Sequence, residues 1–247
     1  MVERNHPLPL YYQLMQELRS RIEQGEWKPG DLFPSERELC QAYGVSRMTV
    51  RQALAELVNE GLLRRDQGRG TFVAKPKIRK RLSRLTSFTE EMRSRGKQAG
   101  ARVLRLEMVP ARPRIADFLE IDAERPIALI ERLRLADGEP IGIECSYLSF
   151  KGCEAVLRED LTRSLYEILS KRFGVIPTRA QEEIEVGTCN PREAQILGIQ
   201  PGDPVMLIRR RTLDQNGRPF EFVESVYRGD NYILSVELMA EEPSAHS

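Results

Sequence analysis

Two arginines that stand two residues apart in an apolar segment are the first residues of this chain that could carry chemistry. Arg132 and Arg134 lie among Ile130, Leu133 and Leu135, and residues two apart in a strand point to the same face of a sheet. The pair could be solvated on an exposed face, but its apolar neighbours indicate a strand that is largely buried. Buried charges need a partner of opposite sign. The pattern therefore predicts a site for an anion.

Hydroxyl and carboxylate side chains elsewhere could complete such a site. Ser164 stands at the start of one helical pattern, and Ser87, Phe88 and Thr89 open another. The N–H groups at a helix start favour phosphate or carboxylate, although either serine could be an ordinary N-cap. Three polar residues lie within apolar strand patterns and could hydrogen-bond the hydroxyl or amide groups of a sugar-like ligand: Glu144, Glu221 and Tyr227.

A second set of cations lies near the N-terminus, on an expected helix that begins after Ser46. Arg47 and Arg51 are four residues apart, so they share the face opposite the apolar stripe, with Thr49 beside them. The planar guanidinium of arginine can meet guanine O6 and N7 together, and the helix starts at Ser35 and Ser46 can bind DNA phosphates. The arrangement is typical of a helix–turn–helix, although the solvated face of a plain three-helix cluster would share it.

Two short strands follow this helix and flank a basic turn. Residues 61–65 and 70–73 have strand character, and Gly68, Arg69 and Gly70 stand at the turn. Glycines let a backbone approach DNA closely, and an arginine can enter a narrow minor groove. A plain hairpin has the same pattern, but directly after an arginine-bearing helix we interpret it as the wing of a winged helix–turn–helix.

Local signals place the elements that position these residues. An apolar stripe begins at Leu10 and stops before Gly25, and Ser35 with Glu38 forms a capping box for a second helix. Residues 75–84 are basic and interrupted by proline, which predicts a linker that could also contact DNA phosphates. The expected organisation is a DNA-binding domain over residues 1–74, a linker over residues 75–84, and a domain over residues 85–247 that holds the anion site.

The pattern beyond residue 100 predicts an α+β domain on an antiparallel sheet. Strands are predicted at residues 101–109, 127–135, 141–148, 181–186, 205–212, 220–227 and 232–238. Helices are predicted at residues 114–119, 164–173 and 192–197. Turn-forming residues at 137–140 and 214–219 indicate hairpins between long strands.

Composition excludes several other classes of protein. The net charge of +1 divides into +5 over residues 1–81 and −4 over residues 82–247, and a basic module beside an acidic one suggests a DNA-binding head. The chain has no run of 18 apolar residues and no apolar segment at its start, so we expect neither a membrane span nor a signal peptide. Four cysteines without a C-x-x-C pair indicate free thiols in the cytoplasm. The only histidines are His6 and His246, so we expect no histidine-based triad, no metal site and no cofactor.

The N-terminal motifs resemble those of a known family. Residues 34–39 (PSEREL), 45–54 (VSRMTVRQAL), 60–63 (EGLL) and 68–73 (GRGTFV) are similar to the GntR family of bacterial winged helix–turn–helix regulators. The resemblance covers the whole module. It implies that three arginines contact DNA and that a wing glycine enters the minor groove: Arg37, Arg47, Arg51 and Gly68.

A second resemblance covers the C-terminal domain. Residues 85–96, 132–140, 164–166 and 225–230 are similar to the effector domain of the HutC subfamily, the UTRA domain, which is related in fold to chorismate lyase. Within the subfamily they resemble regulators of amino-sugar use that sense glucosamine 6-phosphate or N-acetylglucosamine 6-phosphate. The resemblance implies that the ligand phosphate contacts Ser87, Phe88, Thr89, Arg132, Arg134, Ser164 and Tyr166. It implies that the sugar contacts Glu144, Glu221 and Tyr227, with Arg179 and Glu183 as nearby candidates.

Together these features favour a ligand-responsive transcription regulator. We expect a repressor of amino-sugar utilisation genes that binds a pseudo-palindromic operator as a homodimer and is released by a phosphorylated amino sugar. A chorismate-lyase-like enzyme with a DNA-binding appendage would share the fold, but the sequence shows no nucleophile paired with a base. A HutC-type regulator of a different small acid is a further alternative. An architectural DNA-binding protein without a ligand is another, and the pair Arg132 and Arg134 argues against it.

Overall fold

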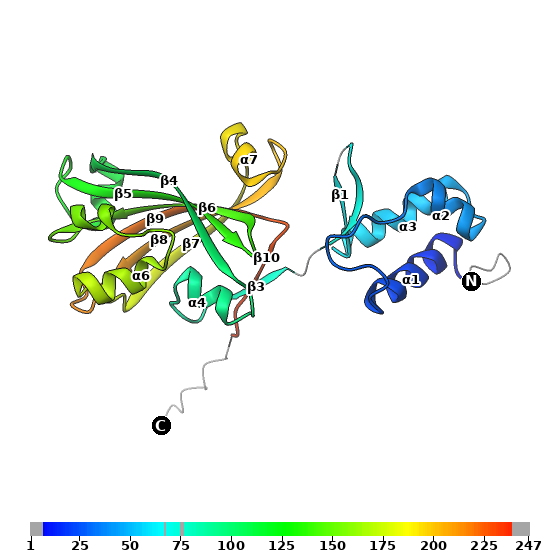
Figure 1. Cartoon of the computed structure of the whole chain (residues 1–247), viewed down its shortest axis with the longest axis horizontal. Helices are drawn as coiled ribbons and strands as arrows, with labels where there is room; N and C mark the ends of the chain where they lie inside the picture. Colours follow the sequence, from blue (N-terminus) through cyan, green and yellow to red (C-terminus); the bar gives the residue numbers. More distant parts are fainter. Residues whose placement is uncertain (1–6, 67, 75–76, 239–247) are drawn as a thin grey trace, which may run out of the picture. The chain divides into compact units, whose positions relative to one another are not determined.

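The structure divides into two compact units that are described separately. It is a computed structural model that describes residues 7–66, 68–74 and 77–238. The units are Met1–Pro76 and Lys77–Ser247 (Figure 1). Each unit has an apolar core of its own.

The N-terminal unit is a three-helix cluster with a β-hairpin. Its elements are α1 (Leu10–Glu23), α2 (Glu36–Tyr43), α3 (Arg47–Asn59), β1 (Leu63–Asp66) and β2 (Gly70–Val73). The apolar stripe of α1 supplies Leu14 and Leu18, which are buried together with Leu54 and Leu57 of α3 and Val73 of the hairpin. β1 and β2 are antiparallel. The predicted winged helix–turn–helix is confirmed.

Side-chain caps determine where α2 and α3 begin. The Ser35 hydroxyl accepts a hydrogen bond from the Glu38 N–H at 3.3 Å, and the Glu38 carboxylate accepts one from the Ser35 N–H at 2.8 Å, which completes the predicted capping box. Ser46 caps α3 by accepting from the Thr49 N–H at 3.2 Å. Between them, Gly44 adopts a φ of 63° and ends α2. Short-range signals therefore encode the turn between the two helices.

Six antiparallel strands form the sheet of the C-terminal unit, in the order β4-β5-β6-β9-β8-β7 (Figure 1). The strands are β4 (Ala99–Pro110), β5 (Pro126–Ala136), β6 (Glu139–Leu148), β7 (Arg179–Thr188), β8 (Pro204–Leu213) and β9 (Pro219–Arg228). Tight turns join β5 to β6 and β8 to β9, where turn residues were predicted. The α+β class with an antiparallel sheet is confirmed.

Short helices pack on both faces of this sheet. They are α4 (Phe88–Arg93), α5 (Pro113–Leu119), α6 (Leu165–Ile168) and α7 (Pro191–Leu197), with a 3₁₀ helix at Cys153–Arg158 and a π-helical turn at Leu169–Phe173. Figure 1 shows α4 and α6 on one side of the sheet and α7 on the other. Ile130 of β5 packs with α6, whereas Leu133 packs with α7. Arg132 alternates with Leu133 and so shares the face of α4 and α6.

The structure corrects two predictions about the ends of the C-terminal unit. β3 (Ile78–Arg81) lies within the predicted linker 75–84 and pairs in parallel with β10 (Tyr232–Ser235). Ile78 is buried in the apolar cluster beneath α4, so one apolar residue anchors a segment that is otherwise basic. The strand predicted at 232–238 ends earlier and pairs with β3 instead of joining the six-stranded sheet.

Three further observations bear on the classes of protein considered above. No helix in the described part of the chain is long and apolar enough to cross a membrane. Across the same residues, His, Cys, Asp and Glu side chains nowhere gather in a group that could hold a metal ion. The four cysteines are free thiols.

Candidate functional site

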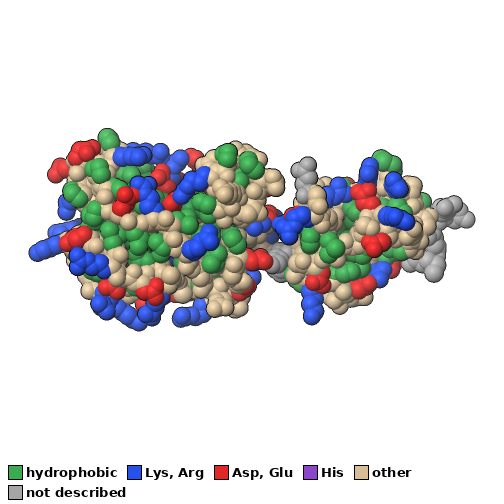
Figure 2. Space-filling view, turned by 45° about the horizontal axis from the view of Figure 1, so that its top comes forward, with side chains coloured by type: hydrophobic (Ala, Val, Ile, Leu, Met, Phe, Trp, Pro, Cys, Tyr) green, Lys and Arg blue, Asp and Glu red, His purple; other side chains and the backbone are tan. Residues whose placement is uncertain are grey.

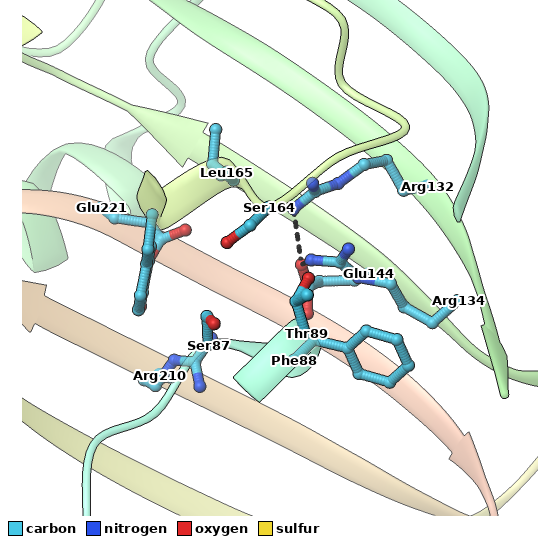
Figure 3. A pocket seen from close by; sticks show the side chains of 11 residues that line it. Ser87, Phe88, Thr89, Arg132, Arg134, Glu144, Ser164, Leu165, Arg210 and Glu221 are labelled. Atoms are coloured by element: carbon cyan, nitrogen blue, oxygen red, sulfur yellow. Dashed lines mark hydrogen bonds and ion pairs between the residues drawn. The ribbon is translucent and has the colours of Figure 1, made fainter. Parts of the chain in front are cut away.

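A polar pocket lies on the α4 and α6 face of the sheet, where both helices begin. Its walls come from α4, α6 and the strands β5, β6, β8 and β9 (Figure 3). The lining residues are Ser87, Phe88, Thr89, Arg132, Arg134, Glu144, Ser164, Leu165, Tyr166, Arg210 and Glu221. Segments up to 134 residues apart in sequence therefore supply one site, and nine of the predicted effector residues meet there.

A single carboxylate oxygen joins the two predicted arginines. Glu144 Oε1 accepts a hydrogen bond from Arg132 Nη2 at 2.8 Å and another from Arg134 Nη2 (Figure 3). Arg132 is 0% exposed and Arg134 is 5% exposed. Burial alone would raise the pKa of Glu144, but the charges of Arg134 and Arg132 lower it to about 2. Burial and the charge of Arg134 lower the pKa of Arg132 to about 10, so both groups stay ionised at neutral pH.

These ion pairs leave part of the arginine donors unused. Arg132 Nε and Nη1, and Arg134 Nε, are buried and have no hydrogen-bond partner in the described part of the structure. The pocket is lined by three arginines but only two carboxylates, Glu144 and Glu221. Buried donors without partners are costly. The site is therefore suited to an anion with several acceptor oxygens.

The pocket is small because its own ion pairs fill it. Its free volume is about 20 Å³, which is room for about one water molecule. A second cavity of about 250 Å³ shares Phe88, Thr89, Arg134 and Ser164 with it. A ligand that occupied both spaces would therefore have to displace part of the contact between Glu144 and the two arginines.

The two serines are N-caps, and both also line the pocket. Ser87 accepts a hydrogen bond from the Glu90 N–H at 3.2 Å and donates to the Glu90 carboxylate at 2.9 Å. Ser164 accepts from the Glu167 N–H at 3.4 Å. The caps hold both hydroxyl groups at fixed positions at the pocket wall.

The remaining polar residues form two short hydrogen-bond chains. Tyr166 Oη donates to Glu221 Oε2 at 2.8 Å, and Thr212 Oγ1 donates to the same oxygen at 3.0 Å. Tyr227 Oη donates to Glu144 Oε2 at 3.4 Å. The ring of Tyr227 can lie close to the backbone of β6 because residue 142 is glycine, since a Cβ there would come within 2.4 Å of the ring. Tyr227 thus orients the Glu144 carboxylate without itself lining the pocket.

The structure does not bring every predicted residue to the pocket. Arg179 begins the edge strand β7 and lines a separate cavity with Arg211. Glu183 lies on the opposite face of the sheet, beside Phe118. Arg210 lines the pocket and was not predicted. Residues 209–211 are three consecutive arginines in a strand, and successive side chains in a strand point to opposite faces of the sheet. The neighbouring residues did not show which of the three faces the pocket.

The residues predicted to contact DNA are solvent-exposed on the N-terminal unit. Arg37, Arg47 and Arg51 are all exposed on α2 and α3, and Arg51 Nε is held by Glu36 Oε2 at 2.8 Å. At the hairpin turn, Gly68 and Gly70 have positive φ values of 74° and 117°, which glycine tolerates better than other residues. Ser35, Ser46, Thr49 and Arg69 also reach solvent. The three arginines therefore stand clear of the core, as groups that meet a nucleic acid must.

Comparison with known proteins places this architecture in a family. Residues 10–73 match the gntR family of bacterial regulatory proteins, and residues 94–233 match the UTRA domain. The chain is 45% identical over 232 residues to the HTH-type transcriptional repressor NagR of Bacillus subtilis, covering 94% of this chain and 95% of the relative. It is 36% identical to the histidine utilization repressor of Pseudomonas putida, covering 83% of each. The crystal structure of PhnF from Mycobacterium smegmatis aligns with a TM-score of 0.66 at 34% identity, covering 92% of this chain and 99% of that one.

The chain therefore belongs to the GntR family of bacterial transcription regulators, and its C-terminal unit is a UTRA domain of the HutC type. It is a regulator and not an enzyme, because the relatives it matches along most of its length are named as transcriptional repressors. Regulators of this family bind DNA operators and small-molecule effectors.

Proposed function

We propose that this protein represses amino-sugar utilisation genes and leaves its operator when it binds N-acetylglucosamine 6-phosphate or glucosamine 6-phosphate. One observation carries the proposal: the pocket holds three arginines, two of them buried, against two glutamates, and it leaves arginine donors without partners. Such a pocket suits a phosphate, which offers several oxygens and a double charge. The neighbouring cavity of about 250 Å³ gives room for the sugar ring.

The pocket residues, together with Tyr227 next to Glu144, divide by chemistry in a way that fits a phosphosugar. The phosphate is assigned to Phe88 at the start of α4 and to the cationic and hydroxyl side chains: Ser87, Thr89, Arg132, Arg134, Ser164 and Tyr166. The sugar is assigned to the acceptors and to the phenol that orients one of them: Glu144, Glu221 and Tyr227. Both glutamates are nearly fully buried, so a sugar hydroxyl or amide would be read by a fixed acceptor.

On the DNA side, we propose that α3 enters the major groove. Arg47 and Arg51 would contact base edges there, while Arg37 and the helix starts at Ser35 and Ser46 hold phosphates. Thr49 lies beside the two arginines on the same helix. The turn of the hairpin would enter the minor groove through Gly68, Arg69 and Gly70. Because its proposed partner is operator DNA, we propose that the protein acts in the cytoplasm.

We propose a homodimer as the functional form, because one winged unit contacts few base pairs and a pseudo-palindrome needs two. The C-terminal unit is the proposed interface. Figure 2 shows hydrophobic side chains gathered in the middle of its visible face, with charged side chains around them. The edge strand β4 exposes Leu106 and Met108, which are 37% and 38% exposed.

An operator-release assay tests the proposed effector. Operator affinity is measured at one salt concentration with a panel of sugar phosphates, amino acids and small carboxylic acids. We expect the two amino-sugar phosphates to weaken operator binding and unphosphorylated N-acetylglucosamine, the matched control, to leave it unchanged. Release by a carboxylic acid alone would favour a regulator of a different small acid. Recovery of the phosphosugar in altered form would favour the enzyme.

A further inference from the structure

Of the three arginines that line the pocket, Arg210 is the one that the sequence analysis did not predict. It lies on β8, and its neighbours two residues away, Ile208 and Thr212, face the pocket side of the sheet. The adjacent Arg209 and Arg211 face the opposite side, beside Phe118. Figure 3 shows the side chains of Arg210 and Arg132 approaching the pocket from opposite directions. Arg210 therefore adds a cation to a wall that the predicted pair does not reach.

The guanidinium of Arg210 forms no ion pair with a carboxylate of the described residues, although Glu221, Glu144 and Glu182 lie near enough to favour its charge. Within the described residues it makes no hydrogen bond or ion pair. Its Nε is shielded from solvent without a partner, whereas the residue as a whole is partly exposed. The Arg210 guanidinium carbon lies over the ring of Tyr166, 5.9 Å from the ring centroid. By contrast, Arg132 and Arg134 share Glu144. The positive charge of Arg210 is therefore available to a ligand.

The carboxylates nearest to Arg210 are engaged elsewhere. Glu221 Oε2 accepts from Tyr166 and Thr212. Glu182 lies opposite Arg210 on β7 and binds Lys80 Nζ at 2.5 Å. Each of these contacts draws a carboxylate oxygen toward another donor. The net positive charge of the pocket thus depends on Arg210, since without it the lining would hold two arginines and two glutamates.

We propose that Arg210 binds the anionic group of the effector and sets the preference of the pocket for a phosphorylated ligand. A neutral pocket would gain little from burying an anion, because each buried charge needs compensation. Arg132 and Arg134 must first loosen their contact with Glu144, whereas Arg210 needs no such exchange. The inference rests on the proposed function for the identity of the effector, but the anion preference can be measured without it.

Calorimetric titration of the full-length protein with two probes tests this role. The probes are inorganic phosphate and N-acetylglucosamine 6-phosphate, at constant ionic strength. We expect R210Q to weaken the binding of both about 10- to 100-fold, as for loss of a charged hydrogen bond, and R210K to weaken it less. R209Q is the matched control, because it removes a neighbouring arginine on the other face, and it should bind both probes like wild type.

The outcomes separate this inference from the proposed function. If wild type binds phosphate through Arg210 but ignores amino-sugar phosphates, the anion role stands and the effector is wrong. If R210Q binds phosphate as tightly as wild type, or if wild type does not bind phosphate at all, the role of Arg210 is wrong. A wild-type thermal melting transition of the C-terminal unit shows that R210Q is folded. Should it not fold, R210M provides the same test, since it fills a similar space without charge.

Discussion

At the scale of single residues, Glu144 fixes the two pocket arginines and also occupies the acceptor position that a bound anion would take. One oxygen of this carboxylate binds both Arg132 and Arg134, so a ligand anion must compete with an acceptor that is already in place. A buried ion pair of this kind contributes little net stability, because desolvation offsets the attraction. Its physical consequence is different: it keeps two arginine side chains buried and close together until an anion replaces part of the contact.

The exposed arginines of α3 give the first prediction. Replacing Arg47 by alanine should cost about 1–3 kcal/mol of operator binding and relax base preference at one position in each half-site, because a paired contact with a base edge is lost. Lysine should restore only part of the affinity, since it lacks the planar fork. Binding is measured at constant salt on the operator and on a set of single-base variants.

A contrasting variant makes the result for Arg47 interpretable. Arg37 is assigned to a phosphate, so Arg37→Ala should weaken binding to all of these DNA sequences by a similar factor. Thermal melting checks that both variants fold. Wild-type affinity and wild-type base preference for Arg47→Ala would exclude α3 as the recognition helix.

At the scale of elements, α4 connects the pocket to the strand that follows the DNA-binding unit. Its first turn supplies Phe88 and Thr89 to the pocket. Just beyond its last turn, Arg95 donates to the backbone carbonyl of Arg79 in β3 through Nε at 2.9 Å, and to the carbonyl of Glu91 through Nη1 at 2.6 Å. Movement of α4 on ligand binding would therefore pull directly on β3.

This connection predicts that Arg95 transmits the signal without binding either ligand. Arg95→Ala should leave effector affinity and operator affinity, measured separately, within about twofold of wild type, and should reduce the change in operator affinity that the effector causes. Lys97→Ala is the matched control, because Lys97 is bound to Asp137 and not to β3. The measurement is the ratio of operator affinities with and without effector for the three proteins. An unchanged ratio in Arg95→Ala would show that the signal takes another route.

The same elements show what the sequence could and could not predict. Each of four helix starts is capped by a serine that bonds a residue three positions later, so these starts could be predicted from the local sequence: Ser35, Ser46, Ser87 and Ser164. The pairing of β3 with β10 joins segments about 150 residues apart, and no local pattern announces it. A related reason explains why the sequence did not predict Arg210 in the pocket and why Arg179, which was expected there, lines another cavity. A strand's face is set by its register against distant neighbours, and one residue of phase separates the pocket side from the opposite side.

At the scale of the whole molecule, the proposed response to an effector requires that the two units, which have separate cores, be coupled to each other. The N-terminal unit ends at residue 76, and β3 begins at residue 78. Any change in β3 is thus close in sequence to the DNA-binding unit. β3 is in turn held by β10, by Arg95 and by the Lys80–Glu182 ion pair, all within the unit that contains the pocket.

Thermodynamic linkage gives the last prediction. If the effector weakens operator binding by some factor, saturating operator must weaken effector binding by the same factor, typically about 5- to 150-fold, or about 1–3 kcal/mol. Arg134→Ala should bind operator like wild type and fail to respond to N-acetylglucosamine 6-phosphate, because the pocket loses a buried cation that lies far in sequence from the DNA contacts. Calorimetry of effector binding with and without operator, and anisotropy of operator binding with and without effector, supply the two factors. Equal factors in wild type, together with no response in Arg134→Ala, would establish that one coupled equilibrium joins the pocket to the operator. Unequal factors would mean that the effector changes something else, such as the association of the subunits, and a normal response in Arg134→Ala would place the effector outside this pocket.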